Sequence, residues 1–422
     1  MLFAKTLLAK FAFAVLTIAL LASVQGCSAP ATPAALAKRG NYAFWPAAPD
    51  MPHIQFLTAI NSSRDIAPAH SGFEQMVYGR EADQSLAINK PYGVRMWNGR
   101  IYVCDIRSKG LTVLDLRQRQ TRIMGATGNG TLTKAIDLAI APDGTKYVVD
   151  ASQSAVVVFN ADERFVNLFQ LPGSNPVGIA VHDNLLYVTD FKAGHVKVLD
   201  RNSGKELRTI GEKGGEDGQF IGPLAVACDK QGNVYVTDTL KARIQKFSPE
   251  GKLLLAYGEA GDRPGNFVRP KHIGVCADGE VHIVDAAFNN IQVFDADGKV
   301  VGFYGSRGNH PGAMDLPAGL EVSETDMDLF EQYIHPAFEA ERLILVTNQF
   351  GPNKISVFAQ GHLRQGKSLA DISPMRADVT AGTVATTQPT TGPTTSTSPA
   401  AFAPSVAAAA PESSAVGKSA RP

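Results

Sequence analysis

Acidic residues at a repeated position are the first groups whose chemistry needs an explanation. Five aspartates and one asparagine end short apolar segments that recur along the chain: Asp105, Asp150, Asp190, Asp238, Asp285 and Asn348. A ring of carboxylates could hold a metal ion. However, an aspartate at a strand end also accepts hydrogen bonds from the backbone N–H groups of the next turn. Because every copy has this residue, and the most irregular copy has asparagine, we expect a structural role and no metal.

A second set of residues varies between the copies and contains most of the candidate binding groups. His195, Arg243, Asn290 and Lys354 each stand just before the next apolar segment, and Arg269, Lys271 and His272 lie on neighbouring stretches. These side chains suit an anionic or protein ligand. No Ser–His–Asp or paired-glutamate constellation can be assigned from spacing, so no catalytic residue is predicted.

These residues belong to an internal repeat. The segment GNVYVTDTLKARIQKF at 232–247 returns as GEVHIVDAAFNNIQVF at 279–294, an interval of 47 residues. Two further sets share that interval: Gly211, Gly258 and Gly305, and Pro223, Pro270 and Pro317. Weaker copies lie before and after, which gives six units in all.

Each unit has the pattern of four short strands, because apolar and polar residues alternate and glycine or aspartate interrupts them. Six such units predict an all-β fold, a six-bladed β-propeller over residues 51–365. After Phe358 the chain soon leaves the alternation, so the sixth unit needs a further strand, and the segment HIQFLTAI at 53–60 would add it as the outermost strand of the sixth blade. Pairing the two ends of the domain in this way removes an exposed strand edge.

The pattern GxVYVTDxxxxRIQxF, with Pro-x-x-Val before it, resembles the NHL repeat from Pro91 to about Phe358. The resemblance implies a six-bladed NHL-type propeller. In this family, the peptide-amidating lyases hold zinc through histidines just after the leading proline. The matching positions here are Tyr92, Val177, Leu224, Lys271 and Ala318, with only His272 one residue further on. A catalytic zinc usually needs three protein ligands, so a metal-dependent hydrolase or lyase at the central channel is the alternative function.

Propeller topology places the variable residues together. The loops between second and third strands open on the same face as the connectors between blades. Therefore His195, Arg243, Asn290 and Lys354 should share one face with Arg269, Lys271 and His272, and that face is the predicted binding surface.

The sixth unit contains an insertion, SETDMDLFEQYIHPAFEAER, at 323–342. Leu329, Phe330, Tyr333 and Ile334 follow helical spacing, which predicts a helix that ends before Pro336. That helix would either pack on the outer rim of the propeller or dock a partner.

The N-terminus has the features of a secretory signal over residues 1–26: Lys5 and Lys10, then an apolar run. Its end, SVQGC, resembles the lipobox of bacterial lipoproteins, which implies lipidation of Cys27. Since Ser28 follows rather than aspartate, the resemblance implies the outer membrane. An ordinary signal peptide cleaved near Ala29 is the alternative. Residues 27–50 would form the lipidated tether.

The remaining composition limits the other functions. Forty Lys and Arg balance forty Asp and Glu, so nothing indicates nucleic acid. Cys104, Cys228 and Cys276 are too widely spaced for a disulfide framework. Residues 366–422 are rich in Ala, Thr, Ser and Pro and are predicted to be disordered.

Together these features predict a lipid-anchored propeller that faces the periplasm or the cell surface. It would bind an envelope protein without a cofactor, as a scaffold module. The resemblance to NHL lipoproteins from genomes rich in multihaem cytochromes implies a cytochrome-rich complex as its setting.

Overall fold

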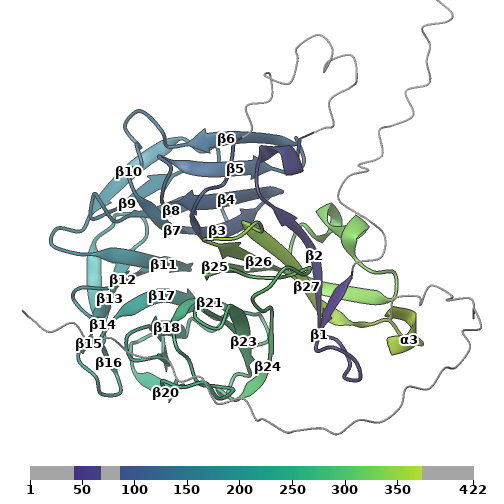
Figure 1. Ribbon diagram of the computed structural model, residues 1–422. Coiled ribbons are helices and arrows are strands. Elements are labelled where there is room, and N and C mark those ends of the chain that lie inside the picture. Colours follow the sequence, from purple (N-terminus) through teal and green to yellow (C-terminus); the bar gives the residue numbers. More distant parts are fainter. Residues whose placement is uncertain (1–41, 68–85, 373–422) are drawn as a thin grey trace, which may run out of the picture. The chain divides into compact units, whose positions relative to one another are not determined.

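Six antiparallel sheets surround a common channel in the computed structural model of the chain, which describes residues 42–67 and 86–372 (Figure 1). Blades one to three contain twelve strands: β3 (Pro91–Trp97), β4 (Arg100–Asp105), β5 (Leu111–Asp115), β6 (Gln120–Met124), β7 (Ala135–Ile140), β8 (Lys146–Asp150), β9 (Ala155–Phe159), β10 (Phe165–Gln170), β11 (Pro176–His182), β12 (Leu185–Asp190), β13 (His195–Asp200) and β14 (Glu206–Ile210). Blades four and five contain eight: β17 (Pro223–Cys228), β18 (Val234–Asp238), β19 (Arg243–Phe247), β20 (Leu253–Tyr257), β21 (Pro270–Val275), β22 (Val281–Asp285), β23 (Asn290–Phe294) and β24 (Val300–Tyr304). The predicted all-β propeller is confirmed.

The sixth blade joins the two ends of the domain. Its strand order is β1-β2-β27-β26-β25, with bounds β1 (Ala43–Trp45), β2 (Ile54–Ile60), β25 (Pro317–Ser323), β26 (Phe338–Asn348) and β27 (Ile355–Leu363). Strand β2 pairs antiparallel with β27, from Ile54 opposite Gln360 to Ile60 opposite Ile355. The predicted closure is therefore confirmed. Strand β1 lies inside the range assigned to the tether, so regular structure starts before residue 51.

The channel is built by the first strand of each blade. Strands β3, β7, β11, β17, β21 and β25 contact one another in a closed ring. Their neighbours in each sheet are the most buried strands: all five residues of β8, β18 and β22 are buried. Apolar side chains from adjacent blades form continuous cores between the sheets. This burial holds the channel strands in a fixed arrangement.

The glycines and aromatic residues repeated at 47-residue intervals shape the connectors between blades. In the connector before blade four, β15 (Glu212–Lys213) pairs with β16 (Gln219–Phe220) in parallel. Gly211 has a φ of 73°, and a Cβ there would lie 2.4 Å from the Phe220 ring. Only glycine combines a positive φ with so close an approach. Gly258 against Phe267 repeats the arrangement.

The insertion in blade six differs from the predicted helix. It forms two 3₁₀ turns, η3 (Met327–Leu329) and η4 (Glu331–Tyr333). The helical spacing is present, but Phe330 adopts φ −116° and ψ 0° between the turns, and Ile334 is extended. Phe330 is 2% exposed in the core beneath, and Leu329, Tyr333 and Ile334 pack against that core. These contacts favour packing over docking.

Two short elements complete the described chain: the 3₁₀ turn η1 (Ser63–Asp65) and the helix α3 (Leu369–Ile372). The second lies in the range predicted to be disordered, and Ile372 packs against the core of the sixth blade. The predicted signal sequence, Cys27 and the rest of the C-terminal range fall outside the described residues. Within the described ranges, no helix has the length and apolar character needed to cross a membrane.

Candidate functional site

The repeated acidic residues are buried links between connectors and strands. Each of the five aspartates is at most 2% exposed. Asp285 accepts hydrogen bonds from the backbone N–H of Val268 in the preceding connector (2.8 Å) and of Ala287 in the following turn (2.9 Å). Connector donors recur in the other blades, and Asn348 accepts one from Asp315 (3.2 Å). This is the hydrogen-bonding pattern that a structural role requires.

Most channel strands carry a small residue two positions after their start. These residues are Gly93, Gly178, Ala225 and Gly319. The strands approach so closely there that a Cβ on Gly319 would lie 2.0 Å from the Tyr92 carbonyl oxygen. Blades two and five instead carry Asp137 and His272, whose side chains occupy the channel interior.

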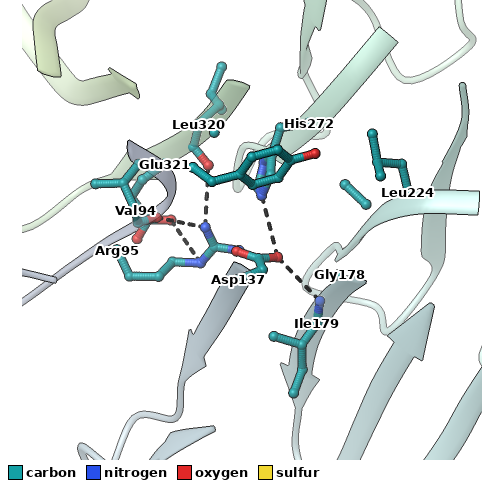
Figure 2. Close-up of polar contacts among 12 residues, drawn as sticks. Val94, Arg95, Asp137, Gly178, Ile179, Leu224, His272, Leu320 and Glu321 are labelled. Carbon is teal, nitrogen blue, oxygen red and sulfur yellow. Dashed lines mark hydrogen bonds and ion pairs between the residues drawn. The ribbon is translucent and has the colours of Figure 1, made fainter. Parts of the chain in front are cut away.

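Asp137 and His272 face each other across the channel (Figure 2). His272 Nε2 lies 3.5 Å from Asp137 Oδ2, which also accepts a hydrogen bond from the Ile179 N–H (3.2 Å). Both side chains are 1% exposed, and the Asp137 carboxylate is the polar group that the structure places beside the His272 ring. Burial raises the pKa of Asp137, but Arg95 and then His272 outweigh it, so that the carboxyl has a pKa below its usual value.

Arg95 connects this pair to a second carboxylate. Its Nη2 lies 3.8 Å from Asp137 Oδ1, and its Nε lies 3.5 Å from Glu321 Oε2. The same guanidinium donates to the carbonyl oxygens of Val94 (2.7 Å) and Leu320 (3.4 Å). Burial raises the pKa of Glu321 to about 7, although the charge of Arg95 opposes the shift. Four blades thus contribute one charged network to the channel.

The Arg95–Glu321 pair lines a pocket at one end of the channel. Its volume is about 240 Å³, and residues from the second half of all six channel strands surround it. We call this pocket the well. The other lining side chains, such as Ala139, Ala227 and Val322, are small or apolar. The well can therefore admit a small molecule whose polar group meets the charged pair.

The raised pKa of Glu321 predicts a change of stability with pH. A carboxyl with a folded pKa near 7 and an unfolded pKa near 4.5 binds a proton on folding. Its stabilising effect is complete below pH 4.5 and is lost as the pH rises through 7. We expect the free energy of unfolding of the wild type to fall by on the order of 3 kcal/mol across that window, relative to Glu321→Gln. Urea unfolding at pH 5 and pH 8 measures the difference.

Glu324→Gln is the matched control, because Glu324 is exposed three residues away. Its free energy of unfolding should follow that of the wild type at both pH values. Equal pH dependence of the wild type and Glu321→Gln would contradict the assignment.

Of the predicted binding residues, Arg243, Lys271 and His272 have buried or inward-pointing side chains, whereas the others are exposed or half-buried. We use the name connector face for the connectors between blades together with the loops from second to third strands. Arg243 begins β19 on this face, yet its side chain is 7% exposed. It bonds Asp217 Oδ1 (2.9 Å) and the carbonyls of Glu216 and Gln219. Arg243 therefore holds its own connector in place, and its expected contact with a ligand needs correction.

Lys271 and His272 also point inward. The Lys271 ammonium donates to Gln349 Oε1 (3.1 Å) and lies 5.7 Å from the centre of the Tyr92 ring. Burial, followed by the charges of Arg269 and Lys90, lowers the pKa of Lys271 to about 8. His272 lies in the channel interior. The structure leaves Arg269 exposed at the surface, and His195, Asn290 and Lys354 half-buried.

The connector face is more apolar than the sequence indicated. Four large apolar side chains there are exposed: Ile221 (39%), Leu240 (60%), Val268 (53%) and Phe350 (48%). Next to Phe350 is a pocket of about 240 Å³, lined by residues 307–308 and 313–315 of a connector and 350–353 of a loop. The same loops and connectors carry exposed lysines and an arginine: Lys109, Lys192, Lys241 and Arg269.

The channel does not assemble the ligands of a zinc enzyme. Among the described residues, its His, Cys, Asp and Glu side chains form no group of three whose ligand atoms lie within 4.8 Å of one another. His272 has a single carboxylate beside it, and that carboxylate is already bonded to Arg95 and to the backbone of Ile179.

Sequence reasoning missed Arg95, Asp137 and Glu321. A signal was present for Asp137, because it replaces a small residue at a fixed position of the repeat. Arg95 and Glu321 occupy another such position, where Ala139, Ala180, Ala227 and Gly274 stand in the other blades. Departures from small residues in the channel strands therefore mark the charged network.

Comparison with solved structures supports the fold. A crystal structure of an auxiliary nutrient binding protein from Bacteroides ovatus has 14% identity, 76% coverage of this chain, 77% of its own and a TM-score of 0.51. An auxiliary nutrient binding protein from Bacteroides thetaiotaomicron has 12% identity, covers 67% of this chain and 71% of its own, and has a TM-score of 0.49. Virginiamycin B lyase from Staphylococcus aureus has 15% identity, covers 66% of this chain and 86% of its own, and has a TM-score of 0.46. No protein-family model matches the chain. At these identities the likeness shows a β-propeller fold and does not extend to a shared ligand.

Proposed function

We propose that this protein is a lipid-anchored NHL-type lipoprotein of the outer membrane that binds an envelope protein through its connector face. The observation that carries the proposal is the exposed apolar group on that face, with Phe350 beside a pocket. Exposed apolar surface on a soluble domain, when it is edged by polar residues, often marks an interaction site. A pocket beside an aromatic side chain is also a common anchor point in protein interfaces.

The charges of the connector face indicate the chemistry of the partner. Lys192, Lys241 and Arg269 are exposed on the same face as the apolar residues. The Lys90 ammonium lies 5.3 Å from the centre of the Phe350 ring. A complementary partner therefore has an apolar centre with acidic residues around it. A subunit of a cytochrome-rich envelope complex with such a surface would fit.

The well is the less suitable binding surface for a protein. Its charged pair is satisfied internally, because Arg95 bonds two backbone carbonyls as well as Glu321. Its lining comes only from channel strands, so no exposed rim of large apolar side chains surrounds it. The connector face offers both an apolar surface and unpaired charges.

The membrane part of the proposal is supported by the sequence around Cys27. The SVQGC motif favours lipidation, and Ser28 favours the outer membrane over retention at the inner membrane. The propeller then faces the periplasm or the cell surface. In cell fractionation, Cys27→Ser should move the protein from the membrane fraction to the soluble fraction.

Reversing the exposed charges should abolish partner binding. We expect the amount of cross-linked envelope partner to fall by at least about tenfold in a variant with Lys192→Glu, Lys241→Glu and Arg269→Glu. The reason is that three attractive contacts become repulsive. The measurement is quantitative mass spectrometry after cross-linking in intact cells. Leu240→Ser with Val268→Ser tests the apolar centre in the same way.

The control reverses Lys230 and Lys299, which are exposed on the opposite face of the propeller. This variant should retain the partner at the wild-type level. Equal recovery by the variants of both faces would overturn the assignment of the connector face.

A further inference from the structure

Three side chains of blade five form a group of metal-ligand atoms outside the channel. Cys276, Glu280 and His282 lie on the hairpin formed by β21 and β22. One ligand atom from each lies within 4.8 Å of the other two. Cys276 is 2% exposed and His282 is completely buried, whereas the Glu280 side chain is 25% exposed. The group is therefore enclosed on the protein side and reachable from solvent through its carboxylate.

Comparison of blades shows that this group is not part of the repeat. In blade four the same three positions hold Asp229, Asn233 and Tyr235. There the tyrosine hydroxyl bonds the aspartate (3.2 Å), and the asparagine bonds it as well (2.8 Å). Tyrosine also stands at the last of these positions in blades one to three: Tyr102, Tyr147 and Tyr187. Blade five thus differs at all three positions, and only there are all three side chains good ligands for a metal ion.

Neighbouring side chains hold the three ligands in position. His282 Nδ1 lies 3.2 Å from the Tyr304 hydroxyl, which leaves Nε2 directed at Glu280 Oε1 (2.8 Å). The Gln360 amide donates to the same carboxylate (2.5 Å). Metal-binding histidines usually bond a partner through the nitrogen that does not bind the metal. Tyr304 and Gln360 therefore supply the supporting hydrogen bonds that hold the ligand side chains of a metal site in position.

We propose that Cys276 Sγ, His282 Nε2 and the Glu280 carboxylate bind a Zn²⁺-type divalent ion. A thiolate combined with an imidazole favours zinc and its neighbours over Mg²⁺ or Ca²⁺. Bonds of about 2.0–2.3 Å to zinc require ligand atoms within about 4 Å of one another, so the group needs to contract by about 1 Å or less. Three protein ligands leave the fourth position to water. Binding releases to solvent the thiol proton and the proton that His282 Nε2 shares with the Glu280 carboxylate.

The position of the group suggests what the ion would stabilise. Gln360 belongs to β27 and stands opposite Ile54 of the closing strand β2. Close by, Asp278 of blade five forms two hydrogen bonds with Arg342 of β26 (2.7 and 3.2 Å). An ion held by Glu280 would fix the carboxylate that Gln360 bonds, and so would strengthen the junction between blades five and six.

The test uses the full-length protein, purified without a histidine tag and dialysed against chelator. We expect one equivalent of Zn²⁺ to bind and to raise the midpoint of thermal unfolding. Co²⁺ should give a thiolate-to-metal charge-transfer band in the near ultraviolet. The triple variant Cys276→Asp, Glu280→Asn, His282→Tyr reproduces the residues of blade four, which this fold already accommodates. It should lose the cobalt band and bind Zn²⁺ at least about a hundredfold more weakly.

Cys228→Ser is the matched thiol control, since Cys228 is a free cysteine at the end of the equivalent strand of blade four. It should keep the cobalt band and the affinity for zinc. The proposal is overturned if the wild-type protein shows no cobalt–thiolate band. It is equally overturned if Cys228→Ser loses the band, or if the triple variant keeps it. If the triple variant does not fold, the single variant His282→Gln replaces it, and it should likewise lose the cobalt band and bind Zn²⁺ more weakly.

Discussion

A chain that begins after Ile60 will not fold into a cooperative propeller, whereas a chain that begins at Tyr42 will. Strand β2 closes the sixth blade, and Ile54, Leu57 and Ile60 are 4–8% exposed in its cores. Burying each of these side chains contributes about 1.5–3 kcal/mol. Their loss, about 6 kcal/mol together, is comparable with the whole stability of many domains. Removing β2 also leaves the hydrogen-bonding groups of β27 exposed along a free edge.

Near-ultraviolet circular dichroism and urea unfolding measure this effect. The chain from Tyr42 should show a single sharp transition, and the chain from residue 61 should show no native near-ultraviolet signal. Leu57→Asp tests the same contact by one substitution, because it puts a charge into the core. His53→Asp, at an exposed position just before β2, should unfold like the wild type. A chain from residue 61 that keeps the sharp transition would contradict the role of β2 in closure.

The repeat made most of the fold predictable. Glycine at 211, 258 and 305 recurs because each connector needs a positive φ beneath a bulky side chain. The aspartates recur because each one joins a connector to its blade. Such residues are set by local geometry that is the same in every copy. For this reason the six copies of the repeat indicated the number of blades. The incomplete last copy, together with the resemblance to NHL lipoproteins, indicated the closing strand.

The charged network was not predictable, because it depends on contacts between blades. Arg95, Asp137 and Glu321 come from three blades and meet only after the ring closes. Each looks like an isolated departure from the repeat, with no spacing that relates it to the others. The burial of Arg243 was hidden for a similar reason. Its carbonyl partners lie in an irregular connector, and their direction depends on how that connector folds.

The insertion shows another limit of the sequence. Its apolar residues have helical spacing, and the structure does bury Phe330. However, the segment must begin and end at fixed points of the hairpin between β25 and β26. Two short 3₁₀ turns meet that constraint here, with Asp326 in the left-handed region before the first turn. Spacing identified the buried side of the segment but not its helix type.

Replacing Asp150 by alanine will be among the most damaging single substitutions at any strand end of the propeller. Asp150 is completely buried and accepts hydrogen bonds from four backbone N–H groups, at 2.5–3.1 Å. Hydrogen bonds to a charged acceptor contribute about 1.5–3 kcal/mol each, and their effects are not additive. We expect Asp150→Ala to lower the free energy of unfolding by about 4 kcal/mol, measured by urea unfolding. Asp162→Ala, an exposed residue of the same blade, should change it by less than about 0.5 kcal/mol.

The sixth blade shows what an amide needs at this position. Asn348 accepts one backbone hydrogen bond through Oδ1, and its Nδ2 donates to Ser356 Oγ (3.1 Å). The residue of blade two that matches Ser356 is Val157, which has no acceptor. Asp150→Asn should therefore lower the free energy of unfolding almost as much as Asp150→Ala does, because the N–H groups of the new amide would face other hydrogen-bond donors.

Adding Val157→Ser should recover part of the loss from Asp150→Asn. A double-mutant cycle separates this interaction from the cost of each substitution alone. We expect a favourable coupling of about 1 kcal/mol, because the serine hydroxyl supplies the acceptor that Ser356 supplies in blade six. Zero coupling would mean that the amide finds another partner in blade two. In that case the loss caused by Asp150→Asn would come from the missing negative charge. Asn348 would then be tolerated in blade six for a reason other than its hydrogen bond to Ser356.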